Sequence, residues 1–221
     1  MSWIPTSVFV PLPGRFAHAQ LVGPHDPQRA GVEAFIAAVY RDRYGAQLHS
    51  FLPHLLAYYD LAGTLVAAVG LRLGSEGPLF VEQYLDLPAE VAIAQRLDCH
   101  GVWRQAMAEV GNFAAATPGA ARELIVQVTC LLNSAQVRWV LFAATRQLRN
   151  AFERLQLSPV ELVEARPERL AGSQTDWGRY YDANPVVVCG NVATGHAYLM
   201  QRLQPELEAS APAALCLAGG L

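Results

Sequence analysis

Residues 102–163 read VWRQAMAEVGNFAAATPGAARELIVQVTCLLNSAQVRWVLFAATRQLRNAFERLQLSPVELV, and their patterning sets the architecture of the chain. This stretch holds three strand candidates, and a helix candidate separates each from the next. The first helix follows Pro118 and Gly119, and its apolar residues share one face: Leu124, Ile125, Val128, Leu131, Leu132 and Ala135. We expect the strands on either side of this helix to be parallel, because a helical crossover returns the chain in the same direction.

Further elements are predicted on both sides of this stretch. An apolar stripe over 27–44 predicts a helix that ends at Gly45, and Ala62-Gly63 indicates a hairpin turn between two antiparallel strands. Outside the stretch, the other strands are predicted over 16–22 and 185–192, and the other helices over 88–97 and 196–207. Within it, the strand candidates cover 102–115, 138–144 and 158–163, and the second helix candidate covers 147–157. The expected fold is therefore of the α/β (α+β) class, with a mixed, mostly antiparallel, twisted sheet and helices on both faces. We expect one domain over 15–208, an irregular segment over 1–14 and a frayed tail over 209–221.

Composition excludes several classes of protein. The chain has 221 residues, 52% of them hydrophobic and 16% charged, which argues against a disordered protein or a coiled coil. The net charge of −3 argues against a broad nucleic-acid-binding face. All sixteen basic residues are arginine, so no Schiff-base lysine and no P-loop lysine exists.

Several sequence motifs are missing, and their absence excludes further types of active site and argues against secretion or a membrane span. The four cysteines form no CxxC pair and match no zinc spacing, and neither GxSxG nor GxGxxG occurs. We expect no bound metal and no resident cofactor. The N-terminus lacks the basic region of a secretory signal, and no uncharged apolar stretch reaches the length of a membrane span. A soluble, cytoplasmic protein with no transmembrane segment is expected.

Glu109 to Ala114 form the first candidate site. Strand alternation places Glu109 and Gly111 on one face and Asn112 on the other, and a bulge at Gly111 would bring Glu109 and Asn112 to one opening. A buried carboxylate beside a cleft can accept a proton from an amine. The alternative is a carboxylate paired with Arg104 or Arg72, and both interpretations stay open.

Two more clusters carry weaker signals. Glu82, Tyr84 and Asp86 lie among apolar residues, either as a binding lip or, for the carboxylates, as helix caps before the predicted helix. The aromatic run from Trp177 to Asp182 lines an apolar pocket or packs a loop over the sheet.

These residues resemble a known family. Six short motifs, spread in one order over about residues 15–200, resemble the bacterial thermostable haemolysin family: YRDRYGA (40–46), FLP (51–53), GLR (70–72), PLFVEQYL (78–85), EVGNFA (109–114) and WGRYY (177–181).

A second resemblance concerns the fold and the mechanism. The order of hairpin, bulged strand with a glutamate, helix, strand, helix and strand is similar to the GNAT acyltransferase fold, and Asn150 to Leu157 looks like a late GNAT motif. Arg72 followed by the Glu109 to Ala114 string looks like the N-acyl-homoserine-lactone synthases and related N-acyl amino acid synthases. Two departures are plain. Asn112 stands where those synthases usually carry arginine, and residues 116–122 are a reduced form of the GNAT pyrophosphate loop.

The resemblance implies roles for individual residues. Glu109 would be the catalytic base, with Glu82 as the second candidate. Five residues would bind the acceptor: Arg72, Asn112, Tyr84, Trp177 and Tyr180. Six would bind the donor: Gly111, Phe113, Thr117, Gly119, Arg122 and Asn150. A backbone N–H near Gly111 or Phe113 would stabilise the oxyanion, and Phe80, Trp139, Phe142 and Trp177 are candidate walls for the acyl chain.

The activity so implied is N-acyl transfer from a fatty acyl thioester to a small amine or amino acid. The donor would be acyl-CoA or an acyl carrier protein with its phosphopantetheine arm, and the sequence is compatible with a homodimer. Two other functions stay open. A non-catalytic acyl-binding or carrier-protein-binding module would bind thioesters without turnover. A membrane-active haemolysin would lyse cells without any thioester.

Overall fold

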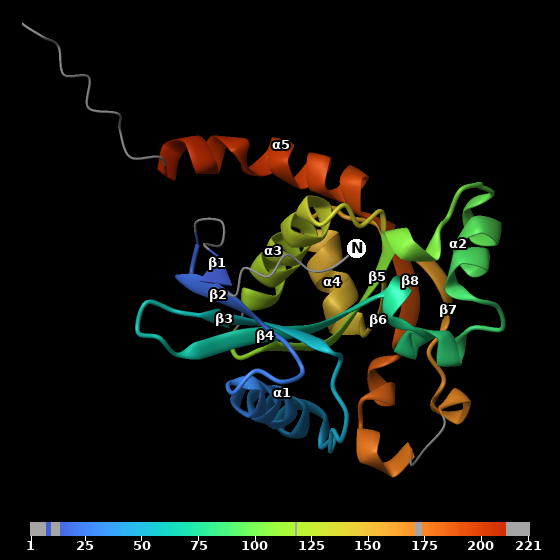
Figure 1. The fold of residues 1–221 in the computed structure, drawn as a ribbon, viewed down its shortest axis with the longest axis horizontal. Helices are drawn as coiled ribbons and strands as arrows, with labels where there is room; N and C mark the ends of the chain where they lie inside the picture. The colour runs from blue at the N-terminus through green and yellow to red at the C-terminus, as the bar shows by residue number, and fades with distance from the viewer. Residues whose placement is uncertain (1–7, 10–13, 118, 171–173, 211–221) are drawn as a thin grey trace, which may run out of the picture.

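One sheet organises the protein. The computed structural model describes residues 8–9, 14–117, 119–170 and 174–210, with the backbone alone described for 8–9, 174–175 and 204–210. In these residues eight strands form a sheet of order β1-β2-β3-β4-β5-β6-β8-β7 (Figure 1). The strands are β1 (Val8–Phe9), β2 (His18–Val22), β3 (His54–Tyr59), β4 (Leu65–Leu73), β5 (Met107–Ala115), β6 (Trp139–Ala144), β7 (Val160–Glu164) and β8 (Val186–Asn191).

The strand directions confirm the predicted mixed sheet. Neighbouring strands are antiparallel at every pairing except β5 with β6, which are parallel. Along the chain, β5 precedes and β6 follows α3 (Ala120–Ser134), so the parallel pair is the one predicted for a helical crossover. The hairpin prediction is also confirmed, since β3 and β4 pair directly around Gly63, which has the positive φ of 75° that the turn requires.

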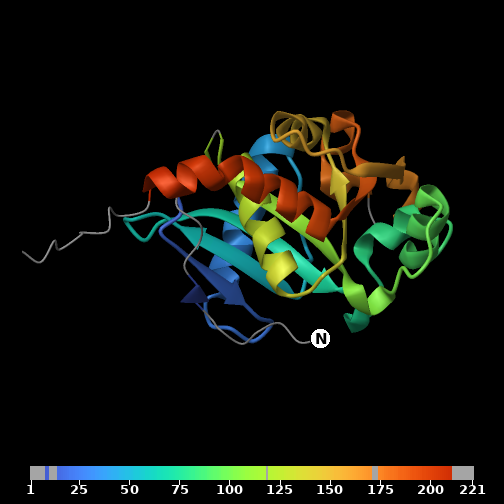
Figure 2. The ribbon, with the colours of Figure 1, turned by 90° about the horizontal axis from the view of Figure 1, so that it is seen from above.

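Helices cover both faces of the sheet (Figures 1 and 2). One face carries α3, α4 (Arg146–Arg154) and α5 (Val192–Ser210), and Leu124, Val128 and Leu132 of α3 enter the core with Phe142. The other face carries α1 (Arg29–Tyr44) near β3 to β5, and α2 (Ala89–Leu97) near β7. Helix α1 ends at the predicted Gly45, which has a φ of 69°.

Several predicted boundaries differ from the structure. The long strand predicted from Val102 begins only at Met107, because Arg104 to Ala106 form a 3-10 turn whose Arg104 guanidinium donates to the carbonyls of Gly74 and Gly77. The final helix begins at Val192 instead of 196. Within the irregular segment predicted over 1–14, 8–9 forms β1, and within the frayed tail predicted over 209–221, residues 209–210 belong to α5. Residues 1–7, 10–13 and 211–221 lie outside the described part. The limits of one domain at 15–208 stay a prediction.

The sheet opens beyond Glu109. Strands β5 and β6 are paired only at three positions, the last of which joins Glu109 to Leu141. On the β4 side, Ala68 is opposite Ala114 and Gly70 is opposite Gly111, so Asn112 and Phe113 together face the single Val69. The predicted bulge is therefore present, immediately after Gly111. Beyond Glu109, β5 therefore stays paired with β4 around the bulge but no longer pairs with β6, and residues of both β5 and β6 line the cavity described below.

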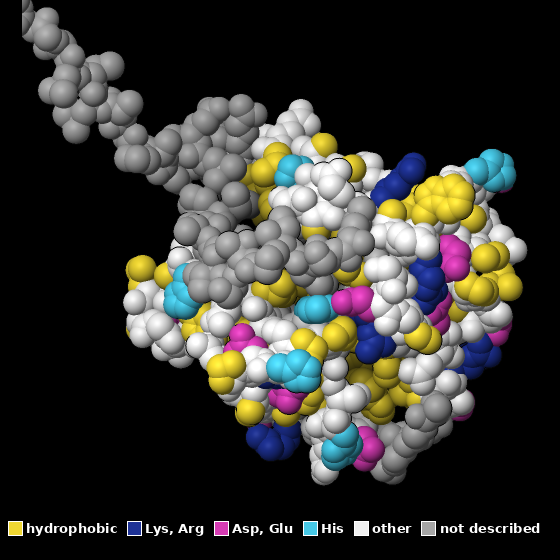
Figure 3. Space-filling view, viewed as in Figure 1, with side chains coloured by type: hydrophobic (Ala, Val, Ile, Leu, Met, Phe, Trp, Pro, Cys, Tyr) yellow, Lys and Arg dark blue, Asp and Glu magenta, His cyan; other side chains and the backbone are white. Residues whose placement is uncertain are grey.

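The surface is mixed in charge. On the face seen in Figure 3, basic and acidic side chains are interspersed among apolar and neutral ones, without a broad basic area. Among the described residues no helix combines the length and the apolar character of a membrane span.

Candidate functional site

A cavity of about 910 Å³ lies where the strands separate. Its walls come from both faces of the sheet. On the face of α1 they include segment 47–52, Phe80 and Trp177, and on the face of α3 they include Val128, Phe142 and Phe152. Glu109, Gly111, Asn112 and Phe113 of β5 lie on its wall as well. The cavity thus joins a polar, aromatic compartment to an apolar one.

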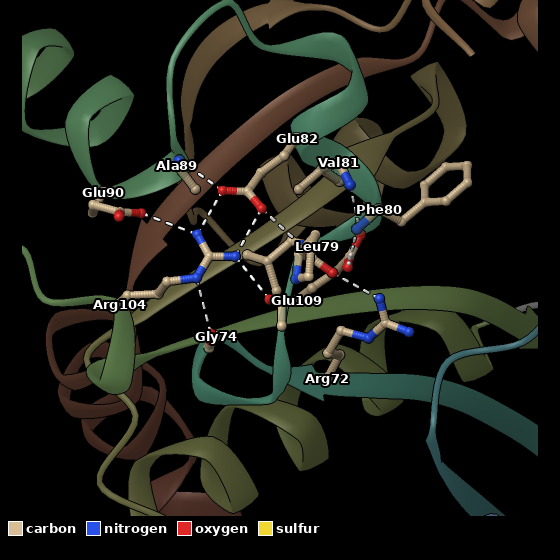
Figure 4. A network of polar contacts seen from close by, with 12 residues as sticks. Arg72, Gly74, Leu79, Phe80, Val81, Glu82, Ala89, Glu90, Arg104 and Glu109 are labelled. Atoms are coloured by element: carbon tan, nitrogen blue, oxygen red, sulfur yellow. Dashed lines mark hydrogen bonds and ion pairs between the residues drawn. The ribbon is translucent and has the colours of Figure 1, made fainter. Parts of the chain in front are cut away.

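Glu109 is a buried carboxylate at the edge of this cavity. Its side chain is 2% exposed, and its two oxygens accept the backbone N–H groups of Phe80 (2.7 Å) and Val81 (2.9 Å) (Figure 4). Those N–H groups are free because they begin the 3-10 helix η2 (Phe80–Tyr84), which has no earlier turn to bind them. Burial raises the pKa of Glu109 to about 7, although the two N–H donors and Arg72 oppose the rise. Such a group exchanges protons near neutral pH.

Glu82, the second catalytic candidate, has a different environment. Its oxygens meet the Arg104 guanidinium at 2.6 and 2.8 Å and accept the N–H groups of Leu79 and Ala89 (Figure 4). Burial would raise the pKa of Glu82, but these hydrogen bonds outweigh it and lower the pKa to about 2. Glu82 is not among the residues that line the cavity. It ties η2 to the start of α2, and so holds the N–H groups that bind Glu109.

The helix cap considered for Asp86 belongs to Glu82 instead. The Glu82 carboxylate accepts the N–H of Ala89, the first residue of α2. Asp86 forms an ion pair with Arg169. Arg104, named above as a partner for Glu109, pairs with Glu82 and Glu90.

Arg72, on β4, lies directly opposite Glu109, on β5. The two residues are direct partners in the register of β4 and β5, and the arginine charge lowers the Glu109 pKa without overcoming burial. One guanidinium nitrogen donates to the carbonyl of Pro78 at 2.7 Å. Arg72 lines the cavity, so it offers a cation to a ligand beside Glu109.

Asn112 holds a neighbouring segment in place. It adopts a left-handed φ of 49° in the bulge, and its side-chain oxygen accepts the N–H of Leu52 at 2.9 Å. Gly70 makes room for this contact, because a Cβ there would lie 2.7 Å from that oxygen and 2.9 Å from the Leu52 Cβ. Arg29 binds the carbonyls of Leu52 and Pro53 from α1. Asn112 therefore fixes the wall formed by segment 47–52.

Aromatic rings form the remaining wall on the α1 face. The Trp177 ring centroid lies 5.9 Å from that of Phe80 and 5.2 Å from that of Tyr180, and the hydroxyls of Tyr84 and Tyr181 are 2.7 Å apart. Trp177, Tyr180 and Tyr84 all line the cavity. Of the two interpretations of this aromatic run, pocket lining and loop packing, the structure supports both.

The compartment on the α3 face is largely apolar. Phe142 and Phe152 stack with centroids 5.0 Å apart, and Leu148 of α4 and Leu132 of α3 lie beside them on the cavity wall. Trp139, predicted with them as an acyl-chain wall, also lines the cavity, from the opposite face of β6.

Four predicted donor-binding residues lie away from the cavity lining. Thr117 accepts a hydrogen bond from Arg15 at 3.4 Å, and Gly119 begins α3 with a φ of 85°. Arg122 and Asn150 are exposed, on α3 and α4. Gly111 and Phe113 are the two predicted donor residues that do reach the cavity.

Sequence reasoning missed two contributors. Tyr40 lines the cavity from near the C-terminal end of α1, but the sequence only placed it in the apolar stripe and in the YRDRYGA motif, without a role in the site. Segment 47–52 overlaps the FLP motif (51–53) at its end, but that motif did not indicate a cavity wall. The available signal was the pair Gly70 and Gly111 on facing strands, since facing glycines mark a close approach of another segment, here Leu52.

Among the described residues, no cluster of three or more His, Cys, Asp or Glu is arranged to hold a metal ion.

Several solved structures share this fold. The CoA-dependent acyl-homoserine lactone synthase MesI aligns with a TM-score of 0.51 and 13% identity, over 84% of this chain and 95% of that one. FeeM, an N-acyl amino acid synthase from uncultured soil microbes, aligns with a TM-score of 0.54 and 15% identity, over 84% and 98%. The CoA-dependent acyl-homoserine lactone synthase BjaI, solved with SAM and isopentyl-CoA, aligns with a TM-score of 0.54 and 10% identity, over 83% and 88%. These likenesses confirm the predicted GNAT-like fold.

No curated protein shows significant similarity to the chain. The profile of one family, described as Thermostable hemolysin, matches residues 22–196. That range contains all six motifs on which the resemblance rested, together with Glu109, Arg72 and the aromatic wall. The chain therefore belongs to the thermostable hemolysin family.

Proposed function

We propose that this protein is an N-acyltransferase, which moves a fatty acyl group from an acyl thioester onto the amine of a small acceptor. The observation that carries the proposal is the position of Glu109. A carboxylate with a pKa of about 7 lies at the opening between β5 and β6, where an aromatic compartment and an apolar compartment meet.

The compartment on the α1 face suits the acceptor. Glu109 can take a proton from an amine there, and Arg72 can bind a carboxylate, because a guanidinium matches a carboxylate in two hydrogen bonds. The rings of Phe80, Trp177 and Tyr180 offer apolar surface to the rest of the molecule. An amino acid or a similar small amine fits this set of groups.

The compartment on the α3 face suits the acyl chain. Its wall of Val128, Leu132, Phe142, Leu148 and Phe152 offers no charge, and burying each methylene of a chain there is worth about 0.8 kcal/mol. With the chain on one face and the amine on the other, the thioester carbonyl would lie at the opening beside Glu109.

The reaction follows from this placement. The amine nitrogen attacks the thioester carbonyl carbon and loses a proton to Glu109. The new C–N bond stays, the C–S bond breaks, and the proton ends on the thiolate sulfur. The backbone N–H groups of Phe80 and Val81 hold the carboxylate, so that it faces the amine in one orientation.

The names of the structural neighbours support the same chemistry. MesI and BjaI are named as CoA-dependent acyl-homoserine lactone synthases, and FeeM as an N-acyl amino acid synthase. For this chain the donor is proposed as acyl-CoA or an acyl carrier protein. Because both donors are cytoplasmic, the proposal places the protein in the cytoplasm.

The test is a panel assay with purified protein. Acyl-CoAs and acyl carrier proteins of different chain lengths are incubated with pooled amino acids and amines, thiol release is followed, and products are identified by mass spectrometry. The expected result is an acylated amine whose formation collapses in Glu109→Gln. Glu164→Gln is the matched control, because Glu164 is exposed on β7, and it should keep full activity.

Other outcomes would overturn the proposal. Thioester binding without turnover, indifferent to Glu109→Gln, would make the protein an acyl-binding module. Lysis of membranes by the protein alone, with no thioester consumed, would make it a direct haemolysin.

A further inference from the structure

Tyr40 reaches the cavity, and the mechanism above does not use it. The residue is buried one turn before the end of α1, and it lines the cavity with Asn112 and Phe113. Its ring centroid lies 5.7 Å from that of Tyr44 and 6.1 Å from that of Tyr180. These packed rings hold the Tyr40 ring in one place.

The hydroxyl of Tyr40 lies near the bulge in β5. Asn112 and Phe113 together face the single Val69, so the ladder between β4 and β5 is interrupted there. The backbone N–H of Phe113 is near enough to the Tyr40 hydroxyl to lower its pKa, and both residues line the cavity. A neutral phenol carries an O–H that it can donate to another group.

The environment keeps this hydroxyl protonated. Burial raises the pKa of Tyr40 well above its ordinary value, Tyr44 adds to the rise, and the Phe113 N–H and Arg43 only partly oppose it. The Tyr84 hydroxyl lies within electrostatic range of both Tyr40 and Glu109. Tyr40 is therefore a fixed neutral donor on the same compartment wall as the carboxylate.

We infer that Tyr40 is a further catalytic residue, whose O–H donates a hydrogen bond to the thioester carbonyl oxygen as negative charge develops on it. The inference rests on the proposed acyl transfer. The carbonyl oxygen gains charge as the C–N bond forms and loses it when the C–S bond breaks. Tyr40 keeps its proton throughout, while the amine proton passes to Glu109 and then to the sulfur.

The test compares two phenylalanine variants in the assay that detects the acylated amine. Tyr40→Phe keeps the stacked ring and removes only the oxygen, and kcat should fall by about 100-fold or more, with KM within about threefold, because the donor acts on the transition state. Tyr44→Phe makes the same change one turn later, in a residue that does not line the cavity, and should keep kcat within about threefold.

Thermal unfolding of both variants checks that the fold is intact. If Tyr40→Phe is too unstable to assay, 3-fluorotyrosine at position 40 keeps the ring and makes the phenol a stronger donor. A kcat at or above that of the unmodified enzyme is then expected, and a loss of tenfold or more would contradict the role.

Three results would separate the explanations. If Tyr40→Phe retains kcat within threefold, or changes KM alone, Tyr40 serves packing and the inference is overturned. If both variants lose activity equally, the aromatic cluster as a whole is responsible, and the inference is again overturned. If the unmodified protein forms no acylated amine from any donor, the proposed function itself fails, which the panel assay shows independently of Tyr40.

Discussion

Glu82 belongs to the short helix η2, Glu109 accepts the N–H groups at the start of that helix, and the two carboxylates differ in their partners. Each accepts two backbone N–H groups. Glu82 also meets a guanidinium in two hydrogen bonds, and its pKa falls to about 2, whereas Glu109 feels Arg72 only weakly and its pKa rises to about 7. The difference comes from Arg104. With this partner the Glu82 carboxylate holds η2 in place, and without one the Glu109 carboxylate can accept and release a proton near neutral pH.

The largest expected effect is on activity at Glu109. Glu109→Gln removes the base, and kcat/KM for acyl transfer should fall by about 10²- to 10⁴-fold. Glu82→Gln, assayed at a temperature where it stays folded, should keep activity within about tenfold, because Glu82 does not line the cavity. Steady-state kinetics on both variants check this. Equal losses would remove the distinction between the two carboxylates.

The pH dependence of stability should have opposite signs at the two sites. The pKa of Glu109 rises from 4.5 to about 7 on folding, so its contribution is full below pH 4.5 and is lost as pH rises through about 7, a loss of about 3 kcal/mol. Urea unfolding at pH 5 and pH 8 should show that loss in the unmodified protein and not in Glu109→Gln. A parallel pH dependence in the two proteins would refute the raised pKa.

At Glu82 the sign is reversed. The folded pKa lies below the ordinary value of 4.5, at about 2, so the contribution is present above pH 4.5 and is lost as pH falls toward 2. Glu82→Gln should lower the free energy of unfolding at pH 7 by about 2 kcal/mol, since it leaves the partly buried Arg104 without its main partner. Unfolding in urea measures this, and a change below about 0.5 kcal/mol would mean that the pair does not hold η2.

Removing the Arg72 cation opposite Glu109 tests whether this arginine binds the acceptor and whether it lowers the Glu109 pKa. Arg72→Gln should raise KM for acceptors that carry a carboxylate by about 10- to 100-fold, with little effect on simple amines. It should also move the acidic limb of the pH–rate profile upward, because the Arg72 charge lowers the Glu109 pKa. Kinetics with matched acceptors, with and without a carboxylate, check this. An equal effect on both acceptors would place Arg72 outside the acceptor site.

The smallest effect is expected at Asn112. Asn112→Gly keeps the left-handed backbone but loses the bond to Leu52, and should cost about 1 kcal/mol in unfolding free energy. Asn112→Asp keeps an oxygen acceptor and should lose less. Chemical unfolding of the two variants decides the point, and equal losses would show that the bond to Leu52 contributes nothing.

Much of the fold follows from local patterns. The apolar stripes of α1 and α3, the turn at Gly63 and the crossover between β5 and β6 each rest on residues near one another in the sequence. The start of β5 does not, because Arg104 leaves the strand path to bind carbonyls of residues 74 and 77. That contact depends on a segment about 30 residues away, which no periodicity reports.

The candidate site, like the fold, could be predicted from the sequence only where its features depend on neighbouring residues. Glu109, Gly111 and the bulge follow from a glycine in a strand next to a carboxylate. The roles of Glu82 and Asn112 depend on partners from other elements, Arg104 and Leu52, and neither pairing has a signature in the sequence. Tyr40 resembles an ordinary core aromatic in the sequence because its ring packs in the core, and the role inferred for it above concerns its hydroxyl alone.

The most direct measurement is the rate of acyl-amine formation between pH 6 and pH 9, with an acceptor such as methoxyamine, whose own nitrogen stays unprotonated over this range. The acceptor then contributes no titration. With Glu109 as the base, kcat/KM should rise with pH and level off above about 7, and the residual rate of Glu109→Gln should be flat. A flat profile in the unmodified protein, or the same rising profile in Glu109→Gln, would contradict the role of Glu109.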